Sequence, residues 1–370
     1  MKTFCFKLYN TKRNRKLHKQ INAAGLTYNH CIALHKRYYK LFHKTINCYK
    51  LQAHLAKLKK LKRFSYLKEY GSQAVQDVTE RIDRAYNLFF RNLKHKIRTA
   101  PPAFRKVSKY RSFTLKQASW KLDESSHTLT INKQKYKYFQ SRKIEGRIKT
   151  ITIKRNALGD IYIYLACKTK EKEVLARTGN SVGYDFGLKK FLTASDGKDI
   201  TSPLFFKQNK NKIQKANRLL SRKKKGSNHY RLAKLALARL HKKAANQRKE
   251  FHFKTALTIC ENYALICLET LNIKAMQRLW GRKISDLGFA EFVKILKQEA
   301  TKTGSQVIEI DPFYPSSQIC SHCGYQNHKL KDLRIQQWTC PQCNTVHDRD
   351  RNAALNILKV GTSTFSGEIQ

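Results

Sequence analysis

The sequence predicts a multidomain α/β protein, on three observations. The period of the apolar residues is helical from about residue 15 to 97, alternates over 104–169 and becomes mixed from residue 182. Four cysteines near the end follow a metal-binding spacing. The length of 370 residues suits two or three domains.

The first half reads as a β-region interrupted by helices. Residues 1–9 alternate as a short strand, and the helical pattern that follows ends before Pro101 and Pro102. Alternation returns around residues 148–167, with a turn at 156–160. We expect a hairpin in a small β-barrel or sheet, which the N-terminal strand joins, with the helical lobe inserted between them.

The second half alternates strands with helices. Residues 205–255 read as long helices that contain 17 Lys and Arg and one acid, Glu250. The closing helix is expected at Asp348–Lys359, with Asp348 as its N-cap. The other expected elements are strands at 182–185, 191–195, 264–268 and 307–310, a turn at Asp196–Gly197 and a helix at 289–303.

The charge points to a polyanionic partner. Lys and Arg number 76 against 25 Asp and Glu, a net charge of +51. This charge is spread along the chain, and no apolar run approaches the about 18 residues that span a bilayer, so nucleic acid is a better partner than a membrane. The start shows no signal-peptide pattern, so we expect a cytoplasmic, nucleoid-associated protein whose ten cysteines are metal ligands or free thiols.

Two CxxC pairs predict a structural zinc site. Cys320 and Cys323 are separated by sixteen residues from Cys340 and Cys343, a spacing that suits a β-hairpin ribbon. Four thiolates form a closed tetrahedral shell for one Zn²⁺ and leave no position for water. A redox thiol pair is the alternative, and His322, His328 or His347 is a candidate to replace a cysteine ligand.

Acids are scarce in this chain, so three of them at special positions are informative. Asp185 and Glu269 end apolar strands, and Asp350 lies in the first turn of the last helix. Converging carboxylates form an oxygen site for Mg²⁺, and two such ions about 4 Å apart drive phosphodiester hydrolysis. Each acid alone also fits an ordinary turn, surface or helix-end position, and the residues alone do not separate Asp348 from Asp350.

Several motifs resemble the TnpB (OrfB) family, the RNA-guided nucleases of bacterial and archaeal insertion sequences, which are related to type V CRISPR effectors. The likeness covers nearly the whole chain. The motifs are Val182-Gly-Tyr-Asp-Phe-Gly, Leu268-Glu-Thr-Leu-Asn, the cysteine ribbon with His347-Asp-Arg-Asp-Arg-Asn-Ala-Ala, and the segments 6–9, 144–149, 221–226 and 313–320.

The resemblance implies a RuvC-type, RNase H-like nuclease domain with an inserted zinc ribbon, and a wedge-like β-barrel split by a helical recognition lobe. Asp185, Glu269 and Asp350 would be its catalytic, Mg²⁺-binding acids. The guide would be an RNA from the transposon end, and the target double-stranded and then single-stranded DNA. The implied domains are barrel 1–14 and 101–178, recognition lobe 15–100, nuclease 179–315 and 347–370, and ribbon 316–346.

Nucleic-acid contacts are expected at two kinds of residue. By position, Ser72, Gln73, Gln76 and Ser112 resemble the family's segment that touches a short motif beside the target. The basic runs supply backbone contacts and include Arg222, Lys223, Lys224, Lys225, Arg248 and Lys249. In each case a plain polar surface is the competing interpretation.

The chain departs from the family pattern at two positions. Thr270 stands where an Asp often follows the catalytic Glu, and Gln336 stands where an Arg precedes the ribbon tryptophan. Neither change removes an expected metal ligand. The alternative functions are a guided DNA-binding repressor that does not cut, a transposase or its accessory protein, and a plain zinc-ribbon RNA-binding protein.

Overall fold

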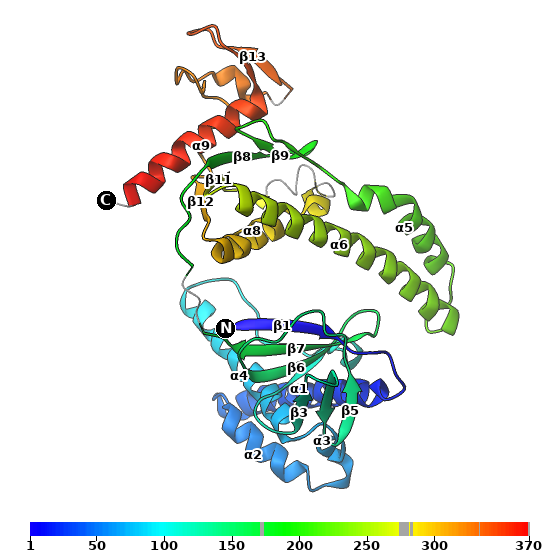
Figure 1. Cartoon of the computed structure of the whole chain (residues 1–370). Coiled ribbons are helices and arrows are strands. Elements are labelled where there is room, and N and C mark those ends of the chain that lie inside the picture. The colour runs from blue at the N-terminus through cyan, green and yellow to red at the C-terminus, as the bar shows by residue number, and fades with distance from the viewer. Residues whose placement is uncertain (171–173, 274–280, 282–283, 333, 369–370) are drawn as a thin grey trace. The chain divides into compact units, whose positions relative to one another are not determined.

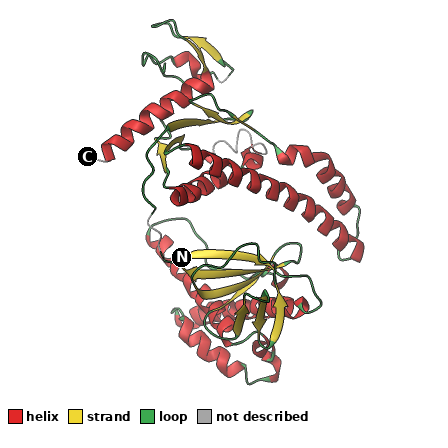
Figure 2. Cartoon of the chain, viewed as in Figure 1, coloured by secondary structure: helices red, strands yellow, loops and turns green. Residues whose placement is uncertain are grey.

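The chain forms two compact units, Met1–Glu171 and Lys172–Gln370 (Figure 1). The computed structural model describes residues 1–170, 174–273, 281, 284–332 and 334–368. Both units combine helices with strands, so the α/β class is confirmed (Figure 2). Among the described helices none is long and apolar enough to cross a membrane.

A four-stranded antiparallel sheet organises the first unit. β1 pairs with β7 from Lys2–Cys167 to Lys7–Tyr162, so the N-terminal strand joins the β-region as expected. Alternate residues of β7 are buried, as a period of two requires. The sheet order is β1 (Lys2–Lys7), β7 (Ile161–Lys168), β6 (Arg147–Arg155), β2 (Ser112–Leu115).

The helices of this unit lie in sequence between β1 and β2. They are α1 (Asn14–Phe42), α2 (Cys48–Leu58), α3 (Tyr66–Glu69) and α4 (Ser72–Lys94), and a second sheet contains β3 (Trp120–Asp123), β4 (Thr128–Ile131) and β5 (Gln134–Lys137). α4 ends earlier than the expected residue 97. Lys96 adopts a left-handed φ of 55°, and its N–H turns back to the carbonyl of Leu93.

One apolar core joins the sheet of the first unit to its helices. Phe4 and Phe6 of β1 are buried in the same cluster as Leu17 and Ile21 of α1. The alternation of β1 therefore points its aromatic side chains into the core and its polar side chains outward.

A five-stranded mixed sheet organises the second unit. β8 pairs in parallel with β11, and β11 in parallel with β12, whereas β9 runs antiparallel to β8. The strand order is β10 (Ile200–Thr201), β9 (Lys190–Ala194), β8 (Ser181–Phe186), β11 (Leu265–Glu269), β12 (Gln306–Ile310). The turn expected at Asp196–Gly197 is present, with Gly197 at φ 86° between β9 and β10.

Helices cover both faces of this sheet. Ile266 and Leu268 pack in one cluster with residues of α6 (Asn228–Asn262) and α8 (Phe289–Thr303). Cys267, which points to the other face, packs with Ile357 of α9 (Arg349–Glu368). α5 (Phe205–Ser221) precedes α6 and packs along it.

The closing helix is longer than expected, because α9 continues to Glu368 instead of ending at Lys359. Gly361 lets it press on the sheet, since a Cβ there would lie 2.3 Å from the Sγ of Cys267. Beyond Gly361, the hydroxyl of Thr362 donates to the carbonyl of Leu358 at 2.9 Å, as a helical turn allows.

Candidate functional site

Asp185 and Glu269 lie at the carboxyl ends of two neighbouring parallel strands. Tyr184 of β8 is the register partner of Leu268 of β11, so the next residue on each strand is one of the two acids. Both side chains are half-buried. The carboxyl ends of parallel strands are where α/β sheets place their ligands.

Asp350 approaches the same edge from the first turn of α9. The helix lies so close to β8 that a Cβ at Gly183 would be 2.2 Å from the carbonyl oxygen of Ala354. Asp350 lies one helical turn before Ala354, and Asp185 lies two residues beyond Gly183. The charge of Asp350 accordingly acts on Asp185 and contributes to raising its pKa.

Burial disfavours the charged form of all three carboxylates, and the other two acids add to this effect at Asp185. Burial first, then the charges of Glu269 and Asp350, raise the pKa of Asp185 well above its usual range. Burial raises the pKa of Glu269 to about 7, although a hydrogen bond from the Phe186 N–H opposes that shift. Burial, followed by the charge of Asp348, raises the pKa of Asp350. Carboxylates in this arrangement gain from binding protons or cations.

The spacing of the carboxylates bears on how they would hold a metal ion. In the described part of the chain, three or more ligand atoms of His, Cys, Asp or Glu lie within 4.8 Å of one another only at the four ribbon cysteines. The ligand atoms of Asp185, Glu269 and Asp350 therefore do not all lie within 4.8 Å of one another. At Mg–O distances of about 2.1 Å, one ion cannot contact all three carboxylates as they stand. The hard oxygen donors fit divalent cations.

Asp348 and Asp350 have different positions in the structure. The Oδ1 of Asp348 accepts the backbone N–H of Arg351 at 2.9 Å, which confirms the expected N-cap of α9. The Asp348 side chain is exposed, whereas that of Asp350 is half-buried and acts on Asp185. The geometry therefore separates two residues that the sequence alone left as rivals.

Two basic residues beside the acids were missing from the sequence-based candidates. The Nζ of Lys190 lies 2.7 Å from the Asp199 carboxylate. The charge of Lys190 partly opposes the rise in the pKa of Asp350. Arg349 is buried, and its Nη1 donates to the carbonyls of Asp332 at 2.7 Å and Ile335 at 3.3 Å. Their only sequence signal is adjacency to the acidic motifs.

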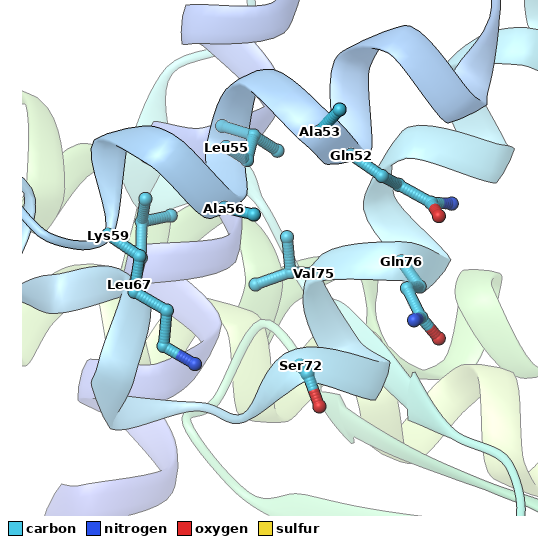
Figure 3. Close-up of a pocket in the computed structure, with 9 residues that line it drawn as sticks. All are labelled: Gln52, Ala53, Leu55, Ala56, Lys59, Leu67, Ser72, Val75 and Gln76. Atoms are coloured by element: carbon cyan, nitrogen blue, oxygen red, sulfur yellow. The ribbon is translucent and has the colours of Figure 1, made fainter.

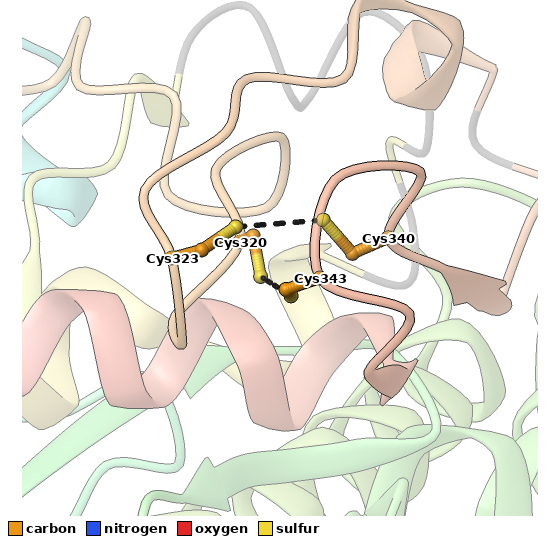
Figure 4. Close-up of side chains that lie close together, drawn as sticks. All are labelled: Cys320, Cys323, Cys340 and Cys343. Atoms are coloured by element: carbon orange, nitrogen blue, oxygen red, sulfur yellow. Dashed lines mark hydrogen bonds between the residues drawn. The ribbon is translucent and has the colours of Figure 1, made fainter.

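The four cysteines meet as the spacing predicted (Figure 4). Sγ···Sγ distances are 3.6 Å for Cys320–Cys343 and 3.6 Å for Cys323–Cys340. A tetrahedral Zn²⁺ with Zn–S bonds of about 2.3 Å needs sulfur atoms about 3.8 Å apart, so the cluster fits zinc.

The loops around the cysteines are built to hold this geometry. Gly324 and Asn344 adopt left-handed φ values of 81° and 56°, and their N–H groups donate to the carbonyls of Cys320 and Cys340. Hydrogen bonds with Thr345 lower the pKa of Cys343 to about 6, which favours the thiolate that binds metal.

The ribbon histidines are not part of the four-cysteine group. His322 and His328 are exposed. His347 of β14 (Val346–Asp348) is buried against Trp338 of β13 (Gln337–Thr339), and its Nε2 lies 3.0 Å from the Sγ of Cys320. His347 therefore lies beside the sulfur cluster, where it can position Cys320.

The expected motif-reading residues of α4 and β2 divide into two groups. The Oε1 of Gln73 accepts the N–H groups of Lys116 at 3.0 Å and Ala118 at 3.2 Å, so it secures the chain beyond β2. The hydroxyl of Ser112 accepts from Arg81 at 3.1 Å. These two side chains are already engaged within the first unit.

Ser72 and Gln76 instead line a pocket of about 310 Å³ between α2 and α4 (Figure 3). Val75 points towards Ala56 across the pocket (Figure 3). The Nε2 of Gln52, which also lines it, donates to Thr79 at 3.1 Å. The pocket combines an apolar floor with amide groups, which are the groups that recognise base edges.

The expected basic contacts also differ from one another. Arg222, Lys223, Lys224 and Lys225 are all exposed between α5 and α6. Arg248 is occupied, because its Nη1 donates to the carbonyls of Ser285 at 3.2 Å and Asp286 at 3.4 Å. The Nζ of Lys249 lies 5.6 Å from the ring centre of Phe253.

Two family models match segments of the chain between residues 164 and 357. Residues 164–279 match a model described as a probable transposase, OrfB_IS605, and residues 289–357 match the Cas12f1-like TNB domain. These segments contain Asp185, Glu269, Asp350 and the four cysteines. The resemblance to the TnpB (OrfB) family is confirmed.

Two relatives and one solved structure align with most of this chain. A Streptomyces pristinaespiralis protein named as an RNA-guided DNA endonuclease is 26% identical over 97% of this chain and 89% of its own. InsQ of Escherichia coli (strain K12), named likewise, is 28% identical over 93% and 88%. A solved Cas12f1–sgRNA–target DNA complex aligns with 96% of this chain and 98% of its own at 17% identity, with a TM-score of 0.36.

The two departures from the family pattern have structural partners here. The hydroxyl of Thr270 donates to the carbonyl of Ile310 at 2.6 Å and thereby joins the ends of β11 and β12. The carbonyl of Gln336 accepts the N–H of Arg349 at 2.8 Å, which ties the ribbon to the start of α9.

Proposed function

We propose that this chain is an RNA-guided, Mg²⁺-dependent DNA endonuclease with a RuvC-type nuclease domain. The observation that supports the proposal is that the charges of Glu269 and Asp350 act on Asp185 at one sheet edge, in a chain of net charge +51. The cationic surface suits RNA and DNA backbones, and the acids suit the metal ions of phosphodiester hydrolysis. The named relatives support the same activity.

Each acid has a distinct part in this proposal. Asp185 and Glu269 extend from adjacent strand ends and would share a cation between them. Asp350 would bind from the helix side, and Lys190 faces it as a counter-charge. When bound, two Mg²⁺ ions supply an activated water and stabilise the leaving oxygen. Asp348 holds the start of α9 in place through its cap.

We propose the finer domain scheme on the same basis. Residues 1–14 and 101–178 would form the wedge-like barrel, residues 15–100 the recognition lobe, and residues 179–315 and 347–370 the nuclease. The zinc ribbon, 316–346, would be a structural insertion, with Arg349 connecting it to the catalytic helix.

The nucleic-acid contacts in this proposal follow the exposure of the side chains. Ser72 and Gln76, in their pocket between α2 and α4, are better placed to read the short motif than Gln73 and Ser112, whose acceptor atoms are engaged. The exposed run Arg222–Lys225 would hold a phosphate backbone.

Guided plasmid cutting tests the proposed function. The protein is expressed with its flanking element DNA, the co-purifying RNA is sequenced, and a matching plasmid is offered with Mg²⁺. We expect double-strand cutting by the wild type and loss of more than about a hundredfold in rate for Asp185→Asn. Glu250→Gln, an exposed acid on α6, is the control that should cut normally.

Other outcomes identify other functions. Tight, guide-dependent binding without cutting by the wild type would indicate a repressor. Undiminished cutting by Asp185→Asn would refute the catalytic role of that residue. Strand joining at element ends would indicate a transposase.

A further inference from the structure

A buried hydroxyl without a hydrogen-bond partner lies on the strand next to Asp185. Thr193 of β9 is 1% exposed, and in the described part of the chain its Oγ1 is buried and makes no hydrogen bond. Buried polar groups of folded proteins are almost always hydrogen-bonded, because an unpaired one costs its desolvation free energy. The unpaired hydroxyl of Thr193 therefore requires an explanation.

The sheet register places this hydroxyl on the same face as the Asp185 side chain. Thr193 and Asp185 are direct partners in the antiparallel pairing of β9 with β8. Residues directly opposite each other in such a pair point to one face, with Cβ atoms about 4.5–5.5 Å apart. The adjacent pair, Tyr184 with Ala194, belongs to the core formed with α6 and α8. Thr193 and Asp185 therefore lie on the opposite face, towards α9.

α9 covers this face of the two strands. Gly183 lies on the same face of β8 as Asp185, and a Cβ there would be 2.2 Å from the carbonyl oxygen of Ala354. α9 contacts β9 as well. The Thr193 hydroxyl is thus shielded from solvent, and the Asp185 carboxylate is the polar side chain that the register sets directly beside it.

A second hydroxyl on the same face provides a contrast. Ser195 follows Thr193 by two residues, and its Oγ accepts the N–H of Gly183 at 3.0 Å. That hydroxyl has a structural role in the sheet, whereas the hydroxyl of Thr193 has no such partner. Both neighbours of Thr193 in β9, Leu192 and Ala194, are apolar, so a valine of the same branched shape would avoid an unpaired hydroxyl here.

We propose that Thr193 is a positioning residue of the metal site, whose hydroxyl donates a hydrogen bond to the Asp185 carboxylate when that carboxylate binds Mg²⁺. The inference rests on the proposed nuclease function and deepens it. Carboxylates that bind metal ions are themselves hydrogen-bonded, and such partners orient them towards the ion. Because the hydroxyl is unpaired in the metal-free protein and paired in the bound state, it favours metal binding.

Thr193→Val tests this with two effects of opposite sign. Valine removes the unpaired hydroxyl, so the Tm of the Mg²⁺-free protein should stay the same or rise. Valine also removes the donor to Asp185, so Mg²⁺ should bind at least about tenfold more weakly. Titration of Mg²⁺ into the full chain at pH 8, followed by Tm, measures both effects. Thr193→Ser keeps the hydroxyl and should bind Mg²⁺ to within a few fold of the wild type.

Three further variants identify the signal. Ser195→Ala removes the hydroxyl that has a sheet partner, so it should lower the Tm of the Mg²⁺-free protein. Thr130→Val makes the same change as the test variant on β4 of the first unit, and it should leave the Mg²⁺ affinity unchanged. Asp185→Asn should remove the Mg²⁺ stabilisation that depends on the acids, which shows which site the titration measures.

Guided cutting provides a second measurement. Thr193→Val should need about tenfold more Mg²⁺ for its half-maximal rate, and a high Mg²⁺ concentration should restore most of that rate. A loss of activity through misfolding would not be recovered by Mg²⁺.

The outcomes separate the two proposals. If Mg²⁺ stabilises Thr193→Val as much as the wild type, or if Thr193→Ser loses as much affinity as Thr193→Val, the positioning role is overturned while the nuclease function stands. A lower Tm for Mg²⁺-free Thr193→Val would show that the hydroxyl is already paired, and would also overturn it. If Mg²⁺ does not stabilise the wild type, the role of Thr193 is overturned, and guided plasmid cutting decides the nuclease function separately.

Discussion

Replacing Glu269 by Gln should stabilise the metal-free protein at alkaline pH. Burial raises the pKa of this carboxyl from 4.5 to about 7, so the folded protein holds a proton that the unfolded chain releases. At 1.36 kcal/mol per pKa unit, the folded state loses about 3 kcal/mol as the pH rises from about 4.5 through 7. Gln resembles the protonated acid and does not titrate, so Glu269→Gln avoids this loss.

The assay is thermal unfolding of dialysed, Mg²⁺-free protein at pH 5 and pH 8. For a domain the size of the second unit, about 3 kcal/mol corresponds to an increase of about 6–12 °C in Tm for Glu269→Gln at pH 8. At pH 5 the gain should be below about 1 kcal/mol, because the folded state is then protonated and the pH lies only about half a unit above the ordinary pKa of 4.5 that the carboxyl has in the unfolded chain. Added Mg²⁺ should stabilise the wild type at pH 8 and leave the variant little changed.

Glu250→Gln is the matched control. Glu250 is exposed on α6 and pairs with Lys254 at 2.9 Å, and this contact lowers its pKa. Its replacement should therefore give no stabilisation at pH 8. A Glu269→Gln protein whose Tm exceeds the wild type equally at both pH values, or falls below it at pH 8, would refute the reasoning about the burial of this carboxyl.

Three further predictions concern packing and the ribbon. Cys340→Ser should reduce bound zinc from one ion per chain to none by elemental analysis, whereas Cys48→Ser should leave it unchanged; retained zinc would exclude the four-sulfur site. Gly361→Ala should lower the free energy of unfolding by about 1–3 kcal/mol, because its Cβ would lie 2.3 Å from the Sγ of Cys267. Adding Cys267→Ala should recover part of this loss. Additive losses in the double variant would contradict the steric explanation. Gln73→Ala should destabilise the first unit by about 1–2 kcal/mol in denaturant unfolding, because two backbone N–H groups lose their acceptor; an unchanged midpoint would show that those groups find other partners.

Local patterns predicted the elements that local physics decides. The alternation of residues 1–9 and 161–167 predicted strands with one buried face. The cap at Asp348 and the cysteine spacing were also readable, because both are geometries of a few neighbouring residues.

Features that depend on distant partners could not be read from the sequence. Gln73 is polar and near an expected binding segment, yet its acceptor is taken by residues more than forty positions away. Arg248 belongs to a basic run, but its guanidinium holds the carbonyls of Ser285 and Asp286. The unpaired hydroxyl of Thr193 lies beside Asp185 because of the pairing of β9 with β8 and the packing of α9 on them, which no periodicity reveals.

The central claim is that three carboxylates at one sheet edge bind the divalent ions that cut DNA, and two neighbouring Asp→Asn changes test it most directly. Asn preserves an N-cap, so Asp348→Asn should retain Mg²⁺-supported cutting of guide-matched DNA to within a few fold. Asp350→Asn, two residues away, should lose more than about a hundredfold. Comparable rates for the two variants would contradict the assignment of the site.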